Sequence, residues 1–167
     1  MSKTAKTSKK QLVDLAQVAR VAKKVDIGQI RALAFSAQTQ PDMPPGMLSV
    51  QNSVSTGYRR DEDDGSLVIL AKFGLTASSD DATVEHPAIE LSLTLELQYE
   101  CSDVGKFQED DLEAFAQVNG PYNAWPYWRE YVQNAVTRMG LPSLVVPVFR
   151  VEDYLAAGSD EEETDDA

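Results

Sequence analysis

Strict alternation of apolar and polar side chains over Ala88–Glu100 constrains the fold more than any other feature of this sequence. The apolar set consists of Ile89, Leu91, Leu93, Leu95, Leu97 and Tyr99. The polar set consists of Glu90, Ser92, Thr94, Glu96, Gln98 and Glu100. Because successive side chains of a strand point to opposite faces, the pattern predicts a strand with one buried and one solvated face. Such a strand is typical of an antiparallel sheet.

Three segments before it are also predicted to be strands. They are Ile27–Gln40, Leu48–Arg60 and Ser66–Thr76. The first is followed by the Pro-rich turn Pro41–Gly46, and the third by the polar linker Ala77–Pro87. Between the second and third, Asp61–Gly65 ends in Asp-Gly, a strong hairpin signal. Since parallel neighbours need a long crossover, these short connections predict a four-stranded antiparallel sheet.

Helices are predicted after the strands. Acidic residues open Asp110–Gln117, which suits a helix N-terminus, and Asn119-Gly120-Pro121 is expected to break that helix. A longer helix is predicted from Pro126 to Met139, with Gly140 as its terminator. A last short helix is expected at Glu152–Ala157. Strands followed by helices predict an α+β domain in which a long C-terminal helix and short helices lie on one side of the sheet.

The termini differ in composition from this domain, which spans residues 25–157. Residues 1–10 are expected to be a disordered basic tail, and residues 158–167 a disordered acidic tail. Residues 11–24 are predicted to form an amphipathic helix. Its apolar positions are Leu12, Leu15, Ala16, Ala19 and Ala22. This helix is expected to pack on its own domain or on another subunit, with a membrane surface or a separate partner as the alternative.

The net charge of −12 limits the choice of partner. Residues 25–158 alone carry 8 basic and 20 acidic side chains, so most of the surface would repel nucleic acid. A basic protein or an unfolded basic polypeptide is the expected partner. Stable membrane insertion is not expected, because no apolar run approaches the ~18 residues of a membrane span. The single Cys101 fits a reducing cytoplasm.

Motifs for catalysis, cofactors and metals are not found in the sequence. The single histidine, His86, lies in a polar linker, and Cys101 is not part of a CxxC pair. A calcium loop starting at Asp61 would place Gly65 at ligand position 5 and Lys72 at position 12, which fails the EF-hand pattern. No catalytic residue, cofactor or metal is therefore expected. An enzyme of hot-dog type is the competing hypothesis, although that fold sets its long helix between early strands.

Aromatic residues are concentrated in one ten-residue stretch. They are Tyr122, Trp125, Tyr127, Trp128 and Tyr131. One interpretation is that they form intramolecular core. The other is that they form a contact surface, because a helix of this length cannot turn all of these rings onto the face that it buries.

This stretch carries a family resemblance. The sequence WPYWREYVQNAVTRMGLPSL, followed by Pro147-Val148-Phe149 and an acidic short helix, resembles the C-terminal half of the SecB export chaperones. The resembling features are Trp125-Pro126-Tyr127, Arg129-Glu130, Arg138 with Gly140, Pro142-Ser143-Leu144 and Pro147-Val148. The close resemblance covers about a quarter of the chain, and the remainder is similar in the order of its elements.

The resemblance implies a SecB-like domain over residues 25–157, assembled as a homotetramer, a dimer of dimers. It implies an ATP-independent holdase that binds non-native polypeptides, such as preproteins for export. The client-binding positions that it implies are Phe115, Tyr122, Trp125 and Trp128. It also implies that Glu96 and Glu100 belong to an acidic face of the sheet that docks SecA.

Two features depart from the SecB pattern. Where the first strand of that family carries acids, this chain has Arg31-Ala32-Leu33-Ala34-Phe35-Ser36, with none. The helix predicted over residues 11–24 is an addition. Both features resemble SecB-like proteins that serve other partners, including chaperones that control toxin–antitoxin pairs. The alternative function is therefore a chaperone dedicated to one partner, such as an antitoxin.

Overall fold

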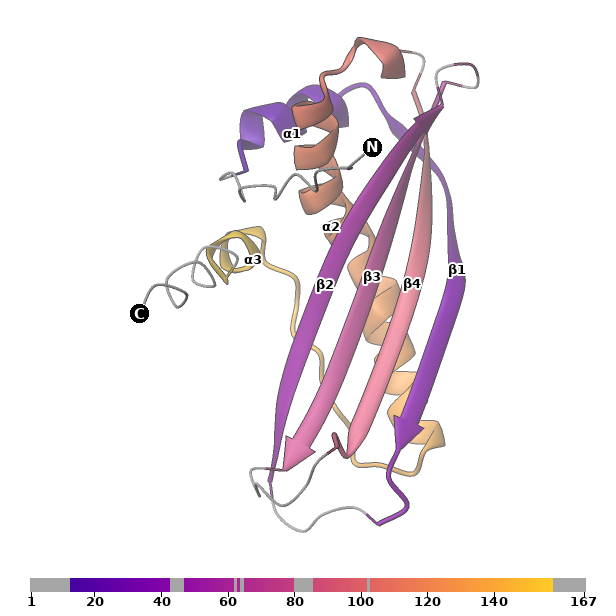
Figure 1. The fold of residues 1–167 in the computed structure, drawn as a ribbon, viewed down its shortest axis with the longest axis vertical. Coiled ribbons are helices and arrows are strands. Elements are labelled where there is room, and N and C mark those ends of the chain that lie inside the picture. The colour runs from indigo at the N-terminus through magenta and orange to yellow at the C-terminus, as the bar shows by residue number, and fades with distance from the viewer. Residues whose placement is uncertain are drawn as a thin grey trace, which may run out of the picture.

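The computed structural model describes residues 13–42, 47–61, 63, 65–79, 86–101 and 103–157. Figure 1 shows its helices and strands. In chain order they are α1 (Leu15–Ala22), β1 (Asp26–Thr39), β2 (Leu48–Asp61), β3 (Ser66–Ser79), β4 (Ile89–Glu100), the short 3-10 helix η1 (Val104–Lys106), α2 (Glu109–Arg138) and α3 (Val151–Ala157). The expectations for residues 1–10 and 158–167 concern segments that lie outside the described residues.

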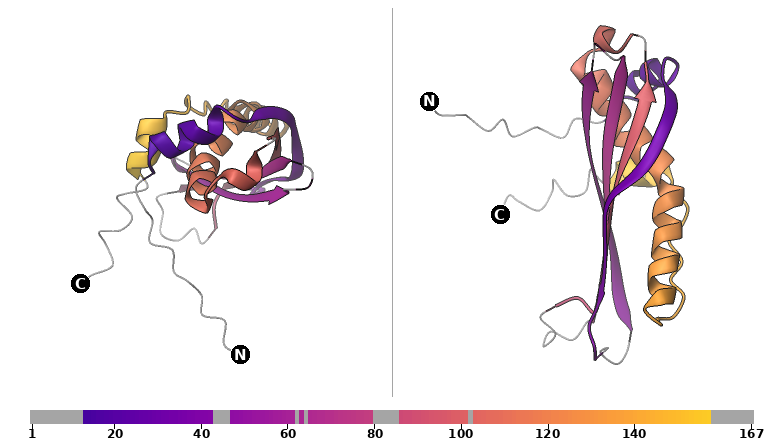
Figure 2. Two further views of the ribbon diagram at one scale, coloured as in Figure 1. Left: turned by 90° about the horizontal axis from the view of Figure 1, so that it is seen from above. Right: turned by 90° about the vertical axis from the view of Figure 1, so that its right-hand side faces the viewer.

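The predicted four-stranded antiparallel sheet is confirmed. Its strand order is β1-β4-β3-β2, so β1 and β2 are the two edges although they are adjacent in the sequence. The helix α2 packs across one face of this sheet, and α1 packs on α2 (Figures 1 and 2). The opposite face is covered by none of the described helices. The α+β class with the helices on one side of the sheet is therefore also confirmed.

The core lies between α2 and the central strands β3 and β4. The apolar set of β4 faces α2 and is buried, as the alternation predicts. Register pairs such as Phe73–Leu93 and Ile69–Leu97 extend this buried face onto β3. The strands β1 and β2 are exposed over most of their length, although α2 contacts the edge strand β2 as well as β3 and β4.

The helix α2 is one continuous element, so the break predicted at Asn119-Gly120-Pro121 is wrong. Both Pro121 and Pro126 lie inside the helix, and packing against the sheet outweighs the hydrogen bonds that they remove. Gly120 has a packing role instead. A Cβ atom added there would lie 2.9 Å from Cγ2 of Ile69, so only glycine lets the helix approach β3 this closely.

The helix α1 begins at Asp14, whose side chain caps it by accepting a hydrogen bond from the Ala16 N–H at 2.8 Å. The apolar face predicted for this helix is wrong: Val18 and Val21 are its buried residues, and Leu15 is exposed. The two larger β-branched side chains bury more apolar area than alanines would. The first two predicted residues, 11 and 12, lie outside the described part of the chain.

The chain reverses direction after α2. Gly140 has φ +68°, the left-handed conformation expected of a helix terminator. An extended segment, residues 141–150, then runs back along α2 and leads into α3 (Figure 1). We call residues 141–150 the return segment.

Candidate functional site

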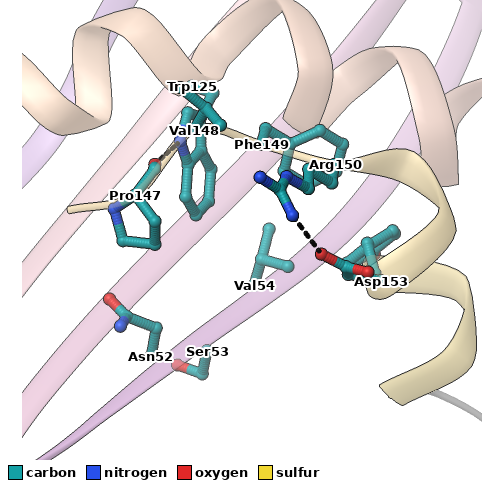
Figure 3. A pocket seen from close by; sticks show the side chains of 10 residues that line it. Asn52, Ser53, Val54, Trp125, Pro147, Val148, Phe149, Arg150 and Asp153 are labelled. Carbon is teal, nitrogen blue, oxygen red and sulfur yellow. Dashed lines mark hydrogen bonds and ion pairs between the residues drawn. The ribbon is translucent and has the colours of Figure 1, made fainter.

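A groove of about 620 Å³ lies between the edge strand β2, the middle of α2 and the return segment (Figure 3). Three consecutive residues of β2 form one wall, and Trp125 of α2 forms another. The full lining is Asn52, Ser53, Val54, Trp125, Pro147, Val148, Phe149, Arg150, Asp153 and Tyr154. The lining is mainly apolar, with polar groups at intervals. Such a groove suits an apolar side chain carried by a longer polar ligand.

Two side-chain hydrogen bonds attach the return segment to α2, beyond the backbone bond from the Leu141 N–H to the Val136 carbonyl at its start. The indole Nε1–H of Trp125 donates to the carbonyl of Pro147 at 2.8 Å, and Nε of Arg129 donates to the carbonyl of Val146 at 3.0 Å. Both donors are side chains one helical turn apart, and both acceptors are backbone groups of the return segment. The wall of the groove is therefore held by side chains of α2 rather than by a sheet ladder.

An aromatic cluster centred on Phe149 forms part of the groove wall. The Phe149 ring packs against Trp125 at a centroid distance of 5.1 Å and against Tyr154 at 5.2 Å, and Tyr122 approaches it at 6.4 Å. Burial raises the pKa of the Tyr154 phenol above its ordinary value. The charged groups of the lining are Arg150 and Asp153, which lie 3.9 Å apart as an exposed ion pair.

The four predicted client-binding residues divide into two pairs. Tyr122, 56% exposed, and Trp125 both lie beside the return segment. Trp128 is only 1% exposed and stacks on Phe73 at 5.5 Å, and Phe115 is fully buried against Tyr99. The expectation that Phe115 and Trp128 face a client does not fit these positions, because α2 turns both rings into the core.

Trp128 still supports the groove from behind. It stacks on Phe73, and Phe73 in turn meets the Trp125 ring edge-on at 5.8 Å. The indole that lines the groove is thus backed by two buried rings. This contact fixes the Trp125 ring from the core side while its Nε1–H is fixed from the return segment.

Several groove residues were missed by sequence reasoning. Phe149 and Tyr154 lie in the apolar stretch and short helix after α2, so their residue types offered a signal. The β2 residues Asn52, Ser53 and Val54 offered none, since a polar strand does not reveal which element lies beside it.

The outer face of the sheet holds the two predicted acidic positions. Glu100 is exposed near one end of β4. Glu96 is only 8% exposed, because its carboxylate contacts Arg31 at 2.7 Å and Arg59 at 3.4 Å. The expected acidic face is therefore not formed at Glu96, whose charge is compensated by two guanidinium groups.

The described residues contain no group of three or more His, Cys, Asp or Glu side chains placed to hold a metal ion. In the same part of the chain, no helix combines the length and the apolar character needed to cross a bilayer.

The four-stranded antiparallel sheet with a long helix across it is a SecB-like fold. The chain is similar to Rv1957, a SecB-like chaperone from Mycobacterium tuberculosis, whose structure was solved in complex with a ChAD peptide from the Rv1956 HigA1 antitoxin. The TM-score is 0.71 at 20% sequence identity, and the match covers 81% of this chain and 97% of that chain. At this identity the likeness establishes the fold, and the SecB-like fold expected from the sequence is confirmed.

A protein of unknown function from Streptococcus agalactiae is also similar at 10% identity, over 74% of this chain and 97% of that chain, but its TM-score is only 0.38. No protein-family model matches this chain, and no curated protein sequence matches it.

Proposed function

We propose that this protein is a SecB-like chaperone, an ATP-independent holdase that binds non-native polypeptides in the groove beside Trp125. The groove carries this proposal, since it offers apolar and aromatic walls to a side chain and polar groups to the backbone on either side. Burying one client side chain of the size of Val, Leu or Phe contributes about 1.5–3 kcal/mol. Such binding is weak at a single groove and needs no nucleotide.

Tyr122 and Trp125 are the proposed client-binding residues, together with Val148 and Phe149 of the return segment. Phe115 and Trp128 act from the core, by fixing the helix that carries them. We assign binding rather than catalysis to this site, and no cofactor.

We also propose that the protein is cytoplasmic and assembles as a homotetramer. The edge strand β1 exposes apolar side chains, including Phe35 at 71% and Ile27. A second copy of the chain that covers this strand would remove them from water. Several grooves in one particle would bind successive segments of one client, which raises the overall affinity without tighter individual contacts.

Two kinds of client fit this proposal. One is a range of preproteins for export, with SecA docked at acidic residues of the outer sheet face, of which Glu100 remains available. The other is a single dedicated partner, such as an antitoxin. The compensated charge of Glu96 favours the dedicated partner, because it removes one carboxylate from the docking face. The peptide bound to the similar Rv1957 chaperone fits this second candidate as well.

Aggregation of a chemically unfolded client tests the proposal. Chemically unfolded citrate synthase would be diluted into buffer without ATP, and its aggregation followed by light scattering with and without the protein. The native mass of the protein would be measured on the same preparation. We expect suppression by a particle of about four chain masses.

Matched tyrosine variants locate the binding site. Neither ring lines the groove directly, but Tyr122 packs against Phe149 of its wall, whereas Tyr127, 46% exposed, makes no such contact in the described part of the chain. Tyr122→Ala is expected to weaken suppression, whereas Tyr127→Ala should leave it unchanged. Equal loss in both variants would exclude the groove as the site, and absence of suppression by the wild-type protein would refute a general holdase.

A further inference from the structure

The centre of the outer sheet face carries more positive than negative charge, in a protein whose net charge is −12. Arg31 of β1, Arg59 of β2 and Lys72 of β3 all lie on this face, and Glu96 is the acidic residue among them. Three cations and one carboxylate leave the centre at +2. The acidic residues of the face lie toward its ends, with Glu100 at one end and Glu90 at the other.

Glu96 holds the two guanidinium groups in place. Nε and Nη2 of Arg31 contact its Oε1 at 2.8 and 2.7 Å, and Nη2 of Arg59 reaches its Oε2 at 3.4 Å from across β3. Each arginine is mostly exposed and has donors beyond those used for Glu96. Two guanidinium groups fixed in this way are prearranged to accept further carboxylates at little cost in side-chain entropy. The exposed ammonium of Lys72 has no ion-pair partner within the described residues.

A shallow apolar site lies between these cations. Leu70 is exposed on the outer face of β3, and its partner in the register on β2 is Gly57. No atom lies within 4 Å of a Cβ atom added at Gly57, so the space beside Leu70 is open. From Val68 to Lys72 the site runs about 13 Å along β3, the length of about four extended residues.

We propose that this face docks an acidic segment of a partner protein, with an apolar side chain over Gly57 and Leu70 and flanking carboxylates at Lys72 and the arginine pair. The partner is a separate protein rather than the acidic C-terminus of this chain. Residues 159–167 contain six acids but no large apolar side chain to fill the space beside Leu70. None of the described helices covers this face, which is the front of the sheet in Figure 1.

Peptide binding to the full-length protein tests this surface. The probe is a fluorescein-labelled dodecamer of alternating Glu and Leu, read by fluorescence anisotropy, with a dodecamer of alternating Lys and Leu as the charge-inverted comparison. We expect saturable binding of the Glu/Leu peptide that weakens as NaCl is raised. Weaker binding of the Glu/Leu peptide than of the Lys/Leu peptide would overturn the proposal.

Two face variants and two controls locate the binding. Lys72→Glu and Gly57→Val are each expected to weaken binding at least fivefold. Gly57→Val should keep the protein folded, since the position is open and valine favours strands. Lys23→Glu makes the same change in net charge at an exposed residue just after α1, and Trp125→Ala alters the client groove; neither should change the affinity of the Glu/Leu peptide. Loss of binding in either control instead would place the peptide elsewhere.

The last measurement uses an unlabelled peptide of residues 159–167 as a competitor of the labelled Glu/Leu peptide. It is expected to compete at least tenfold more weakly than unlabelled Glu/Leu peptide. Equal competition would mean that charge alone suffices, and this would overturn the apolar part of the site and the choice of a separate partner. Because the face variants leave the groove intact, failure of this proposal is distinguishable from failure of the holdase proposal.

Discussion

Alanine substitution of the two tryptophans should separate stability from client binding. Trp128 is buried between Phe73 and Tyr131, so Trp128→Ala leaves a cavity and is expected to cost about 3–5 kcal/mol. In a domain of this size that corresponds to a fall in Tm of about 6–20 °C. Trp125 is half-buried at the surface, and its loss removes one hydrogen bond and two ring contacts, about 1–2 kcal/mol.

Thermal unfolding followed by circular dichroism measures the first effect. Suppression of client aggregation, assayed at a temperature where both variants are folded, measures the second. We expect Trp125→Ala to lose most of its suppression, and Trp128→Ala to keep suppression within about a factor of two once it is folded. A Tm for Trp128→Ala within 3 °C of the wild type, combined with lost suppression, would refute the assignment of Trp128 to the core and return it to the binding surface.

Three further predictions concern packing, pH and the return segment. Gly120→Ala should destabilise the protein by about 1–2 kcal/mol, measured by urea denaturation, because the added Cβ would lie 2.9 Å from Cγ2 of Ile69. Helix propensity alone predicts a gain of stability instead, and such a gain would contradict the close contact. Burial raises the pKa of Tyr99 above its ordinary 10.0, so the unfolded chain loses this proton more readily than the folded chain. The contribution of Tyr99 to the free energy of unfolding should therefore be constant below pH 10 and be lost as the pH rises above it, so that stability falls less steeply above pH 10 in Tyr99→Phe than in the wild type. Arg129→Ala removes the hydrogen-bond donor to the Val146 carbonyl, which should reduce the stability of the return segment by about 1 kcal/mol. Proteolysis within residues 141–150 should become faster while α2 remains protected. An unchanged cleavage rate would show that other contacts hold this segment.

Much of the fold follows from local patterns in the sequence. The alternation in Ala88–Glu100 predicts a strand with one buried face, and the structure buries that apolar set against α2. Gly65 and Gly140 adopt the positive φ angles that their turn and terminator positions require. These predictions succeed because they depend on neighbours in the sequence and on a periodicity that only one kind of element satisfies.

The errors arise where tertiary packing outweighs local preference. The sequence around Gly120 and Pro121 favours a helix break, but the sheet holds α2 continuous, and the glycine serves a close approach to Ile69. Spacing along α2 did not show whether Trp125 or Trp128 would face the core. That choice depends on the angle at which the helix crosses the sheet.

The sequence by itself determined the class of the fold, the main elements and the aromatic stretch from which the site is built. Periodicity and turn residues carry this information directly. Only the tertiary structure decided the strand order, the pairing of Glu96 with Arg31 and Arg59, and the groove that joins Val54 to Trp125 and Phe149. Each of these joins residues that are far apart in the chain, and such contacts exist only once the sheet has formed and the return segment lies beside its edge.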